Sequence, residues 1–378
     1  MVNDVSQDAL RRLAAHRDGA VLSLFLDLDP SKFPTAPARQ SAVDALLHEA
    51  RRAVEDGQLD HDARVRMRDA LTEIEGRLEP IAIPVEGARG LAIFAPGPEA
   101  SVEVLRLPAP IPNRVVLDVS AHVEPLVRLA DRARWCVALV DRSRASFHLG
   151  NEDGMPLSGS LDDEVHGQHR QGGWSYGRYQ RSIENEVGAH LDHVAEALAV
   201  ALREGRFDRL VLAGQQPIRH ELEGRLDHDV RERLVGWVEL DLSAADAEGV
   251  RAALEPIASK ARRDHERGVL ERLAQGVGTP GGHGVAGLRT TLGALSERRV
   301  ETLVVDPGLA SPGSRCPACG LLGLHLAECP ADGTEMEQLD NIIEAAVALA
   351  YEQAAEVVLP APAAELTAVE GIGAVTRF

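Results

Sequence analysis

Short apolar runs of strand character alternate with amphipathic helical stretches along most of this 378-residue chain, and this order is the strongest constraint on its fold. The run Val21–Leu28 indicates a strand and is followed by two helical stretches between residues 37 and 78. Later, the strand-like run Trp135–Asp141 precedes a helical stretch at about 177–204 and a second strand-like run, Leu210–Gly214. Such alternation favours largely parallel strands covered by helices, so we predict an α/β fold.

The length of the chain exceeds what one ordinary hydrophobic core organises, and we predict three domains. An N-terminal α/β domain is expected at 1–127, and a central domain with a mixed sheet and helices at 128–264. A C-terminal domain is expected at 265–378, where a glycine-rich linker comes first and an insertion at 311–335 interrupts the pattern. The last residues, Gly371–Phe378, are expected to form an edge strand.

Charge and apolar content exclude several functional classes. The net charge of −19 argues against general coating of nucleic acid, because phosphate binding requires lysine and arginine; any RNA contact must be local. No stretch approaches about 18 uninterrupted apolar residues, and the N-terminus lacks a signal-peptide pattern. Three of the four cysteines are clustered, which is not typical of a disulfide framework. We therefore expect a cytoplasmic protein that does not enter a membrane.

The segment His166–Arg181 differs from the acidic chain around it. It has no acidic side chain but contains three arginines, two histidines, four glycines and three aromatic residues. Glycine lets the backbone bend, while arginine and aromatic side chains suit phosphate contact and stacking on unpaired bases. This composition favours RNA binding; the alternative is an ordinary flexible loop followed by a helix that Ser175 caps.

Four segments carry a resemblance to one superfamily. The run Gly-Gly-Trp-Ser-Tyr-Gly-Arg-Tyr-Gln-Arg at 172–181 resembles the Gly-Gly-Gln-Ser loop and following helix of archaeal and eukaryotic class-1 release factors. Ala294–Val305 resembles the entrance to the third domain of release factors and Pelota, whose fold is shared with kink-turn-binding ribosomal proteins. Gly371–Phe378 resembles the close of bacterial members of this group. The first 127 residues resemble only the bacterial branch, through Phe25–Pro30. The chain is thus identified as a member of the bacterial branch of this superfamily.

The resemblance implies a ribosome-binding translation factor that enters the A site. By position the two glycines are Gly172 and Gly173, but Trp174 stands where the family has its catalytic glutamine. Balon-type hibernation factors occupy the A site without cleaving anything, so hibernation or rescue without peptide hydrolysis is the favoured function. The implied partners are rRNA, P-site tRNA and a translational GTPase, and the factor is expected to be a monomer. The residues expected to contact RNA are His169, Arg170, Gly172, Gly173, Trp174, Ser175, Arg178 and Arg181.

Two catalytic alternatives stay open, so whether the chain is an enzyme is undecided from its sequence. A peptidyl-tRNA hydrolase of the release or rescue type would need a water-positioning amide close to Gly173. Gln171 and Gln180 are the candidates, since Vms-type peptidyl-tRNA-cleaving proteins resemble this region with a displaced glutamine. A nuclease acting on tRNA would use His166 or His169 as acid or base.

The insertion at 311–335 contains a zinc-knuckle-like pattern. Cys316-Pro-Ala-Cys319-Gly brackets a tight turn of the kind that directs backbone amides at thiolates. Cys329-Pro-Ala-Asp332-Gly repeats the pattern with aspartate in place of the second cysteine. We predict a structural zinc ion held by these four residues, with His325 as the alternative fourth ligand. The competing interpretation is a pair of turns that holds no metal.

Two weaker motifs are explained by ordinary structural roles rather than by function. His190 and His193 share one predicted helix at a spacing that can bind metal, but such pairs are more often exposed helix surface. Gly214-Gln215-Gln216 contains a Gly-Gln pair, but it directly follows a strand-like run and is expected to be a turn between strand and helix.

Overall fold

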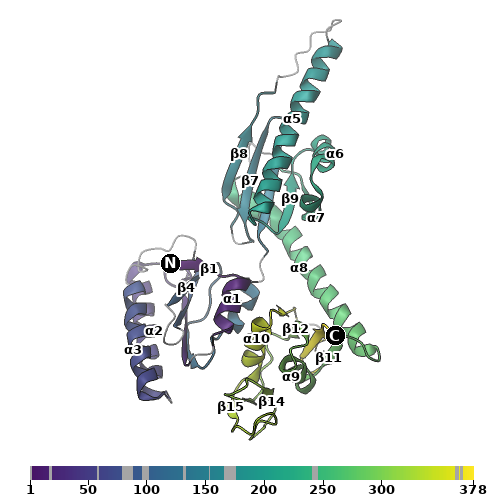
Figure 1. The fold of residues 1–378 in the computed structure, drawn as a ribbon. Coiled ribbons are helices and arrows are strands. Elements are labelled where there is room, and N and C mark those ends of the chain that lie inside the picture. Colours follow the sequence, from purple (N-terminus) through teal and green to yellow (C-terminus); the bar gives the residue numbers. More distant parts are fainter. Residues whose placement is uncertain are drawn as a thin grey trace. The chain divides into compact units, whose positions relative to one another are not determined.

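The computed structural model describes residues 2–16, 19–57, 59–78, 88–95, 102–130, 133–152, 154–165, 176–240, 246–361, 366 and 369–378. The chain forms two compact units. One comprises Met1–Asp131 together with His265–Phe378, and the other comprises Arg132–Asp264. The division falls inside a continuous helix, α8 (Ala247–Gly278), and the predicted division into three domains stays a prediction (Figure 1).

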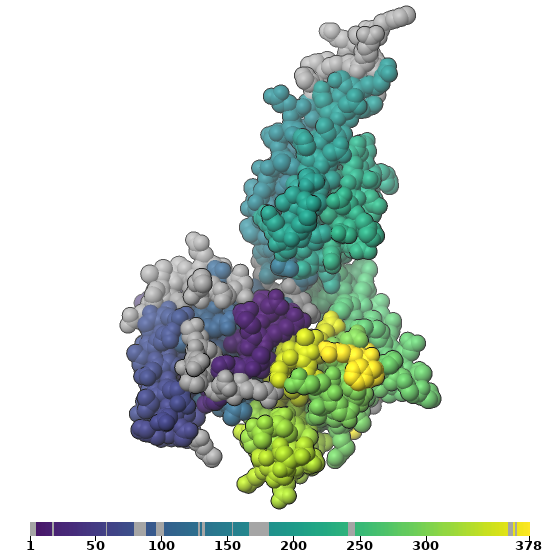
Figure 2. All heavy atoms as spheres, in the orientation of Figure 1, coloured from purple at the N-terminus to yellow at the C-terminus, as the bar shows by residue number. Residues whose placement is uncertain are grey.

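The N-terminal segment forms a five-stranded sheet in the order β1-β4-β3-β2-β5, and only the β1–β4 pair is parallel. Helices α2 and α3 lie side by side on it, and their side chains form one continuous surface, blue in Figure 2. The strands are β1 (Val2–Asp4), β2 (Val21–Asp27), β3 (Gly90–Ala95), β4 (Glu103–Leu107) and β5 (Arg114–Asp118). The helices are α1 (Gln7–Ala14), α2 (Ala36–Asp56), α3 (His61–Leu78), the 3-10 turn η2 (Glu124–Leu126) and α4 (Val127–Ala130).

Strand β2 is buried on both faces because each face meets a different hydrophobic core. Side chains alternate between the two faces of a strand. Leu22, Leu24 and Leu26 pack into a core with residues of α2 and α3. Val21 and Phe25 pack into a second core, which also contains residues of α1 and of the C-terminal segment. Strand β2 therefore lies between two layers of side chains.

The C-terminal segment contains two sheets. The larger has the order β11-β17-β12-β16, and β17 lies between β11 and β12, so the expectation of an edge strand at the chain's end is wrong. A three-stranded sheet of order β14-β13-β15 contains strands of the insertion at 311–335 and, just after it, strand β15. The strands are β11 (Gly284–Ala286), β12 (Val300–Val305), β13 (Gly313–Arg315), β14 (Leu322–Gly323), β15 (Glu337–Leu339), β16 (Glu356–Val358) and β17 (Ile372–Thr376). The helices are α9 (Leu288–Ser296) and α10 (Ile342–Glu352).

The N-terminal and C-terminal segments share one hydrophobic core. Leu10 and Leu13 of α1 belong to the same buried cluster as Leu292 of α9 and Tyr351 of α10. Burial of apolar surface is the main favourable term in folding. The two segments are therefore stabilised by the same buried surface, although a whole unit of the chain separates them in sequence.

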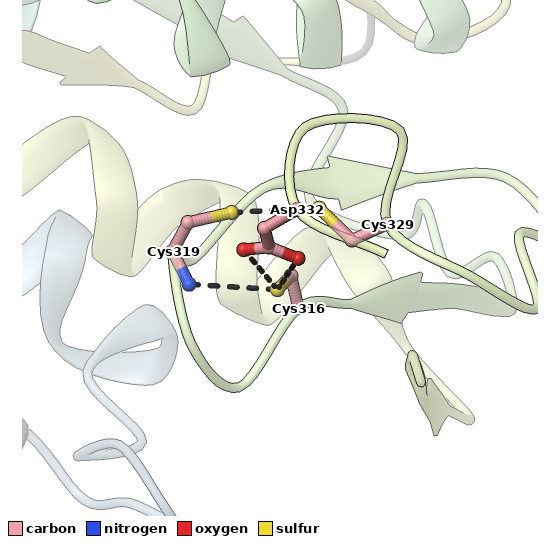
Figure 3. Close-up of side chains that lie close together, drawn as sticks. All are labelled: Cys316, Cys319, Cys329 and Asp332. Atoms are coloured by element: carbon pink, nitrogen blue, oxygen red, sulfur yellow. Dashed lines mark hydrogen bonds between the residues drawn. The ribbon is translucent and has the colours of Figure 1, made fainter. Parts of the chain in front are cut away.

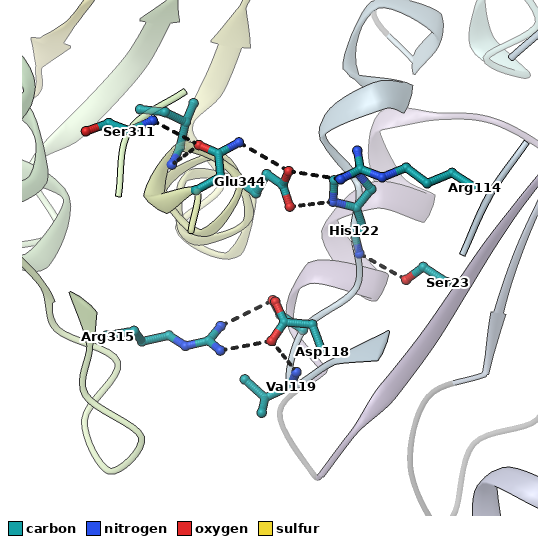
Figure 4. Close-up of polar contacts among 11 residues, drawn as sticks. Ser23, Arg114, Asp118, Val119, His122, Ser311, Arg315 and Glu344 are labelled. Carbon is teal, nitrogen blue, oxygen red and sulfur yellow. Dashed lines mark hydrogen bonds and ion pairs between the residues drawn. The ribbon is translucent and has the colours of Figure 1, made fainter. Parts of the chain in front are cut away.

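Polar bridges cross the boundary between these two segments (Figure 4). The Arg315 side chain is only 8% exposed, and its Nη2 lies 3.2 Å from Asp118 and 2.9 Å from Glu337. His122, with a side chain 1% exposed, lies 2.8 Å from Glu344. A buried guanidinium requires carboxylate partners, because an uncompensated buried charge is strongly destabilising. These pairs fix which surfaces of the two segments meet.

The second unit is built on a mixed sheet of order β10-β9-β6-β7-β8. Strands β6, β9 and β10 are parallel, whereas β7 returns antiparallel to β6 because only a short turn joins them. Helix α5 packs on one face, and the first half of α8 packs on the other. The strands are β6 (Trp135–Val140), β7 (Arg144–Gly150), β8 (Leu157–Asp162), β9 (Arg209–Ala213) and β10 (Leu234–Val238). The remaining helices are α5 (Tyr176–Arg203), α6 (Gln216–Arg225) and α7 (His228–Glu232).

No helix in the described ranges has both the length and the apolar character required to span a lipid bilayer.

Gly214 lies in the turn after β9, as expected for the Gly-Gln pair there. Its φ is +149°, and a Cβ atom added to it would lie 2.3 Å from the carbonyl oxygen of Val140. Gly214→Ala is expected to destabilise the protein by about 1–3 kcal/mol from backbone strain, together with displacement of β6. Chemical denaturation measures the loss. The control is Gly224→Ala in α6, where an added Cβ meets nothing within 4 Å, and an equal loss there would contradict the explanation.

Candidate functional site

Most of the predicted RNA-contacting loop lies outside the described residues. Arg178 and Gln180 lie in the first turns of α5, and their side chains are also outside the description. Arg181 is exposed on the same helix. Eight residues named in the RNA-binding and catalytic predictions lie outside the described ranges: His166, His169, Arg170, Gln171, Gly172, Gly173, Trp174 and Ser175.

The described residues define what flanks this loop. It connects the edge strand β8, which ends at Asp162, to the start of the 28-residue helix α5. The first turn of α5 contains no acidic residue. A helix N-terminus carries a partial positive charge, so the absence of carboxylates leaves this end favourable for a phosphate group.

Asp163 immediately follows β8 and contacts two histidines of α5. Its carboxylate lies 2.6 Å from Nδ1 of His190 and 3.1 Å from Nδ1 of His193. The hydrogen bond from His190 lowers the pKa of Asp163 below its ordinary value. His190 is fully buried, so the expectation that both histidines lie on exposed helix surface is wrong for His190 and correct for His193. No local sequence pattern signals this contact, because it joins residues on opposite sides of the loop.

The cysteine-rich insertion brings four potential metal ligands together (Figure 3). The ligand atoms of Cys316, Cys319, Cys329 and Asp332 lie within 4.8 Å of one another. Cys316 and Cys329 are buried, whereas Cys319 and Asp332 are exposed. His325, the alternative ligand, is exposed and is not in this group.

Both halves of the cluster form the same turn. The amide of Gly320 donates to the carbonyl of Cys316, and the amide of Gly333 donates to that of Cys329, each at 2.9 Å. Both glycines have positive φ, 76° and 73°, which explains why glycine closes each repeat. The repeat that carries aspartate thus keeps the geometry of the repeat that carries two cysteines.

The distances within the cluster suit a tetrahedral metal ion. The sulfur atoms of Cys319 and Cys329 are 3.6 Å apart, and the Cys316 sulfur lies 3.7 and 3.8 Å from the two oxygens of Asp332. A zinc ion with Zn–S bonds of about 2.3 Å has sulfur–sulfur edges of roughly 3.8 Å. A disulfide would require about 2.05 Å. The Thr334 backbone amide lowers the pKa of Asp332 to about 2, so the carboxylate is ionised and fits as the fourth ligand.

Comparisons with known proteins agree with the resemblance seen in the sequence. The model of bacterial archaeo-eukaryotic release factor family 10 matches residues 122–262. Peptide chain release factor subunit 1 of Methanocaldococcus jannaschii is 26% identical over 359 residues, covering 83% of this chain and 84% of that protein. The same factor of Thermococcus onnurineus is 25% identical over 265 residues, covering 63% of each chain, which is less than two thirds of that relative.

Solved structures of the same group are also similar to this chain. The archaeal termination factor aRF1 matches with 18% identity and a TM-score of 0.28, covering 99% of each chain. Archaeal Pelota, in a model of its ribosome-bound complex with ABCE1, matches with 15% identity and a TM-score of 0.44, covering 100% of this chain and 95% of that one. The family model over residues 122–262 and the curated relatives support the placement of the chain with the archaeo-eukaryotic class-1 release factors.

Proposed function

We propose that this chain is a ribosome-binding factor that enters the A site and serves hibernation or rescue without hydrolysing peptidyl-tRNA. One observation carries the proposal: Gly172 and Gly173 keep the family's glycine pair, while Trp174 replaces the glutamine that the family uses for hydrolysis. The names of the relatives support the ribosomal setting, since they are peptide chain release factors and a ribosome-bound Pelota. The cytoplasm is the corresponding compartment.

The chemistry of the loop suits binding better than hydrolysis. An indole ring stacks on any exposed base, and arginines hold phosphates without reading a sequence. The flanking helix start, free of carboxylates in its first turn, adds a favourable partial charge for phosphate. We propose rRNA and P-site tRNA as the contacts of this loop, a translational GTPase as the delivering partner, and a monomer as the active form.

We make two further proposals for the C-terminal segment, one about its fold and one about a metal ion. Its sheet β11-β17-β12-β16 with α9 and α10 is proposed to have the fold of kink-turn-binding ribosomal proteins. Its cysteine cluster is proposed to hold one structural zinc ion through Cys316, Cys319, Cys329 and Asp332, on the strength of the sulfur–sulfur distance. The insertion has a small core of its own, namely Cys316, Cys329 and Met336 with two leucines, so metal binding would supply much of its stability.

Ribosomes that carry labelled peptidyl-tRNA in the P site test the main proposal in one experiment. Co-sedimentation measures binding, and release of labelled peptide measures hydrolysis. Trp174→Ala is expected to weaken binding by roughly 5- to 150-fold, because base–aromatic stacking contributes about 1–3 kcal/mol per base. The double variant Gly172→Ala/Gly173→Ala is expected to weaken it as well, while Gly224→Ala serves as a matched glycine control outside the loop.

The outcomes separate the two candidate functions. Binding that depends on the loop, without peptide release, supports the proposal. Peptide release that survives Trp174→Ala but is lost in Gln171→Ala or Gln180→Ala would identify a peptidyl-tRNA hydrolase with a displaced glutamine. Absence of ribosome binding by the wild-type protein contradicts both candidates.

A further inference from the structure

The contact of Asp163 attaches the chain to α5 just before the loop, and Val165 packs against the same hydrophobic core. The backbone amide of Asp163 donates to the carbonyl of Ser143 at 2.8 Å, just beyond the β7–β8 ladder, whose last pair is Arg144 with Asp162. Its side chain reaches α5, where it meets His190 at 2.6 Å and His193 at 3.1 Å. Asp163, at the end of the edge strand β8, therefore contacts both the turn between β6 and β7 and the helix α5.

His190 occupies a position on α5 where an apolar side chain would be expected. Its neighbours on the buried face, Val187, Leu191 and Val194, all belong to the hydrophobic core. The His190 side chain is 0% exposed, and its Nε2 is buried without a hydrogen-bond partner among the residues that the structure describes. A buried polar ring is unfavourable unless it is hydrogen-bonded. Because only Nδ1 is satisfied, and by Asp163, the contact accounts for the presence of a histidine at this position.

We propose that Asp163 is a positioning residue, which fixes the starting point of the Gly-Gly loop against α5 and thereby supports ribosome binding. His190 lies fourteen positions beyond Tyr176, the first residue of α5, which is roughly 21 Å along the axis at 1.5 Å per residue. The anchor therefore lies well down the helix from its first residue. The inference rests on the proposed function of the loop.

The physical reason for an anchor is preorganisation. A segment held at both ends loses less conformational entropy on binding than one with a loose end. Without the anchor, residues 163–165 would lose their polar attachment to α5 and would sample more conformations, with only the packing of Val165 described among them. Affinity for the ribosome then falls, although no residue of the anchor touches RNA.

Three variants separate positioning from simple stability. Asp163→Ala removes the carboxylate. His190→Leu removes the donor but fills the apolar site, so thermal stability is expected to be preserved or increased. His190→Asn retains an N–H donor near the position of Nδ1. The matched control is Asp192→Ala, which breaks an exposed ion pair of α5 with Arg225 at 3.1 Å without affecting the Asp163 contact.

Hydrogen exchange of the free protein and co-sedimentation with ribosomes are the two measurements. Asp163→Ala and His190→Leu are expected to accelerate exchange at residues 163–165 by about tenfold or more and to weaken ribosome binding by about three- to tenfold. His190→Asn is expected to restore both, and Asp192→Ala to change neither.

Unchanged exchange in Asp163→Ala, or wild-type ribosome affinity in both anchor variants, would overturn the proposal. If the wild-type protein does not bind ribosomes, the proposed function fails and the link to binding fails with it. The exchange measurement still decides, in that case, whether Asp163 anchors the segment.

Discussion

Cys329→Ser is expected to abolish zinc binding and to unfold the insertion at 311–335. Protein purified without chelators should carry about one zinc ion per chain, and the variant less than about 0.1, because a structural site needs all four of its ligands. The insertion has only a minimal core apart from the cluster, so its amides should exchange rapidly in the variant. Metal analysis and hydrogen exchange measure the two effects. Removal of zinc from the wild-type protein with a chelator should reproduce the same local exchange.

Controls within the chain make this result specific. Cys136→Ser changes a cysteine buried in another sheet, where burial raises the pKa of the thiol to about 12, and it should retain full zinc. His325→Ala should also retain zinc, whereas Asp332→Ala should lose it, which decides the fourth ligand. Asp332→Cys should bind zinc more tightly, since it completes a set of four thiolates. Wild-type protein that contains no zinc, with an insertion that is protected from exchange, would contradict the metal proposal.

The cysteine cluster was accessible from the sequence because its geometry is local. Each knuckle is a turn of five residues whose ligands are fixed by spacing and by a closing glycine, and the structure forms both turns. The contact of Asp163 with His190 was not accessible in this way. It joins the end of a strand to the middle of a helix across a loop, and no local pattern records such a pairing. The sequence pattern instead favoured exposed helix surface at position 190.

The fold, too, could be predicted where it depends on local patterns but not where it depends on contacts between distant segments. The α/β alternation was predicted because strands and helices have distinct apolar periods. The place of β17 was predicted wrongly, because its partner β11 consists of Gly284, Val285 and Ala286 within a glycine-rich stretch that resembles a linker. Strand pairing between distant segments depends on tertiary packing rather than on local composition. The core shared by the two ends of the chain was missed for the same reason.

Leu10→Ala is expected to destabilise that shared core by about 2–5 kcal/mol, the usual range for a leucine truncated in a close-packed interior. Leu10 is 0% exposed, and its cluster includes residues of α10 from the far end of the chain. Loss of the side chain should therefore accelerate hydrogen exchange in α10 as well as in α1, although Leu10 and α10 are more than 300 positions apart in sequence.

The matched control is Leu46→Ala in α2. Leu46 is 2% exposed and lies in the other N-terminal core, which contains residues of α2 and α3 but none of α10. The two variants should lose similar free energy of unfolding, yet only Leu10→Ala should loosen α10 under native conditions, because local opening follows shared contacts. Unchanged exchange in α10 would mean that the N-terminal segment opens independently, as three separate domains would require. Accelerated exchange in both α1 and α10 of Leu10→Ala would instead show that residues 1–131 and 265–378 unfold as one cooperative body. In sequence, this body is interrupted by the unit whose loop is proposed to reach the ribosome.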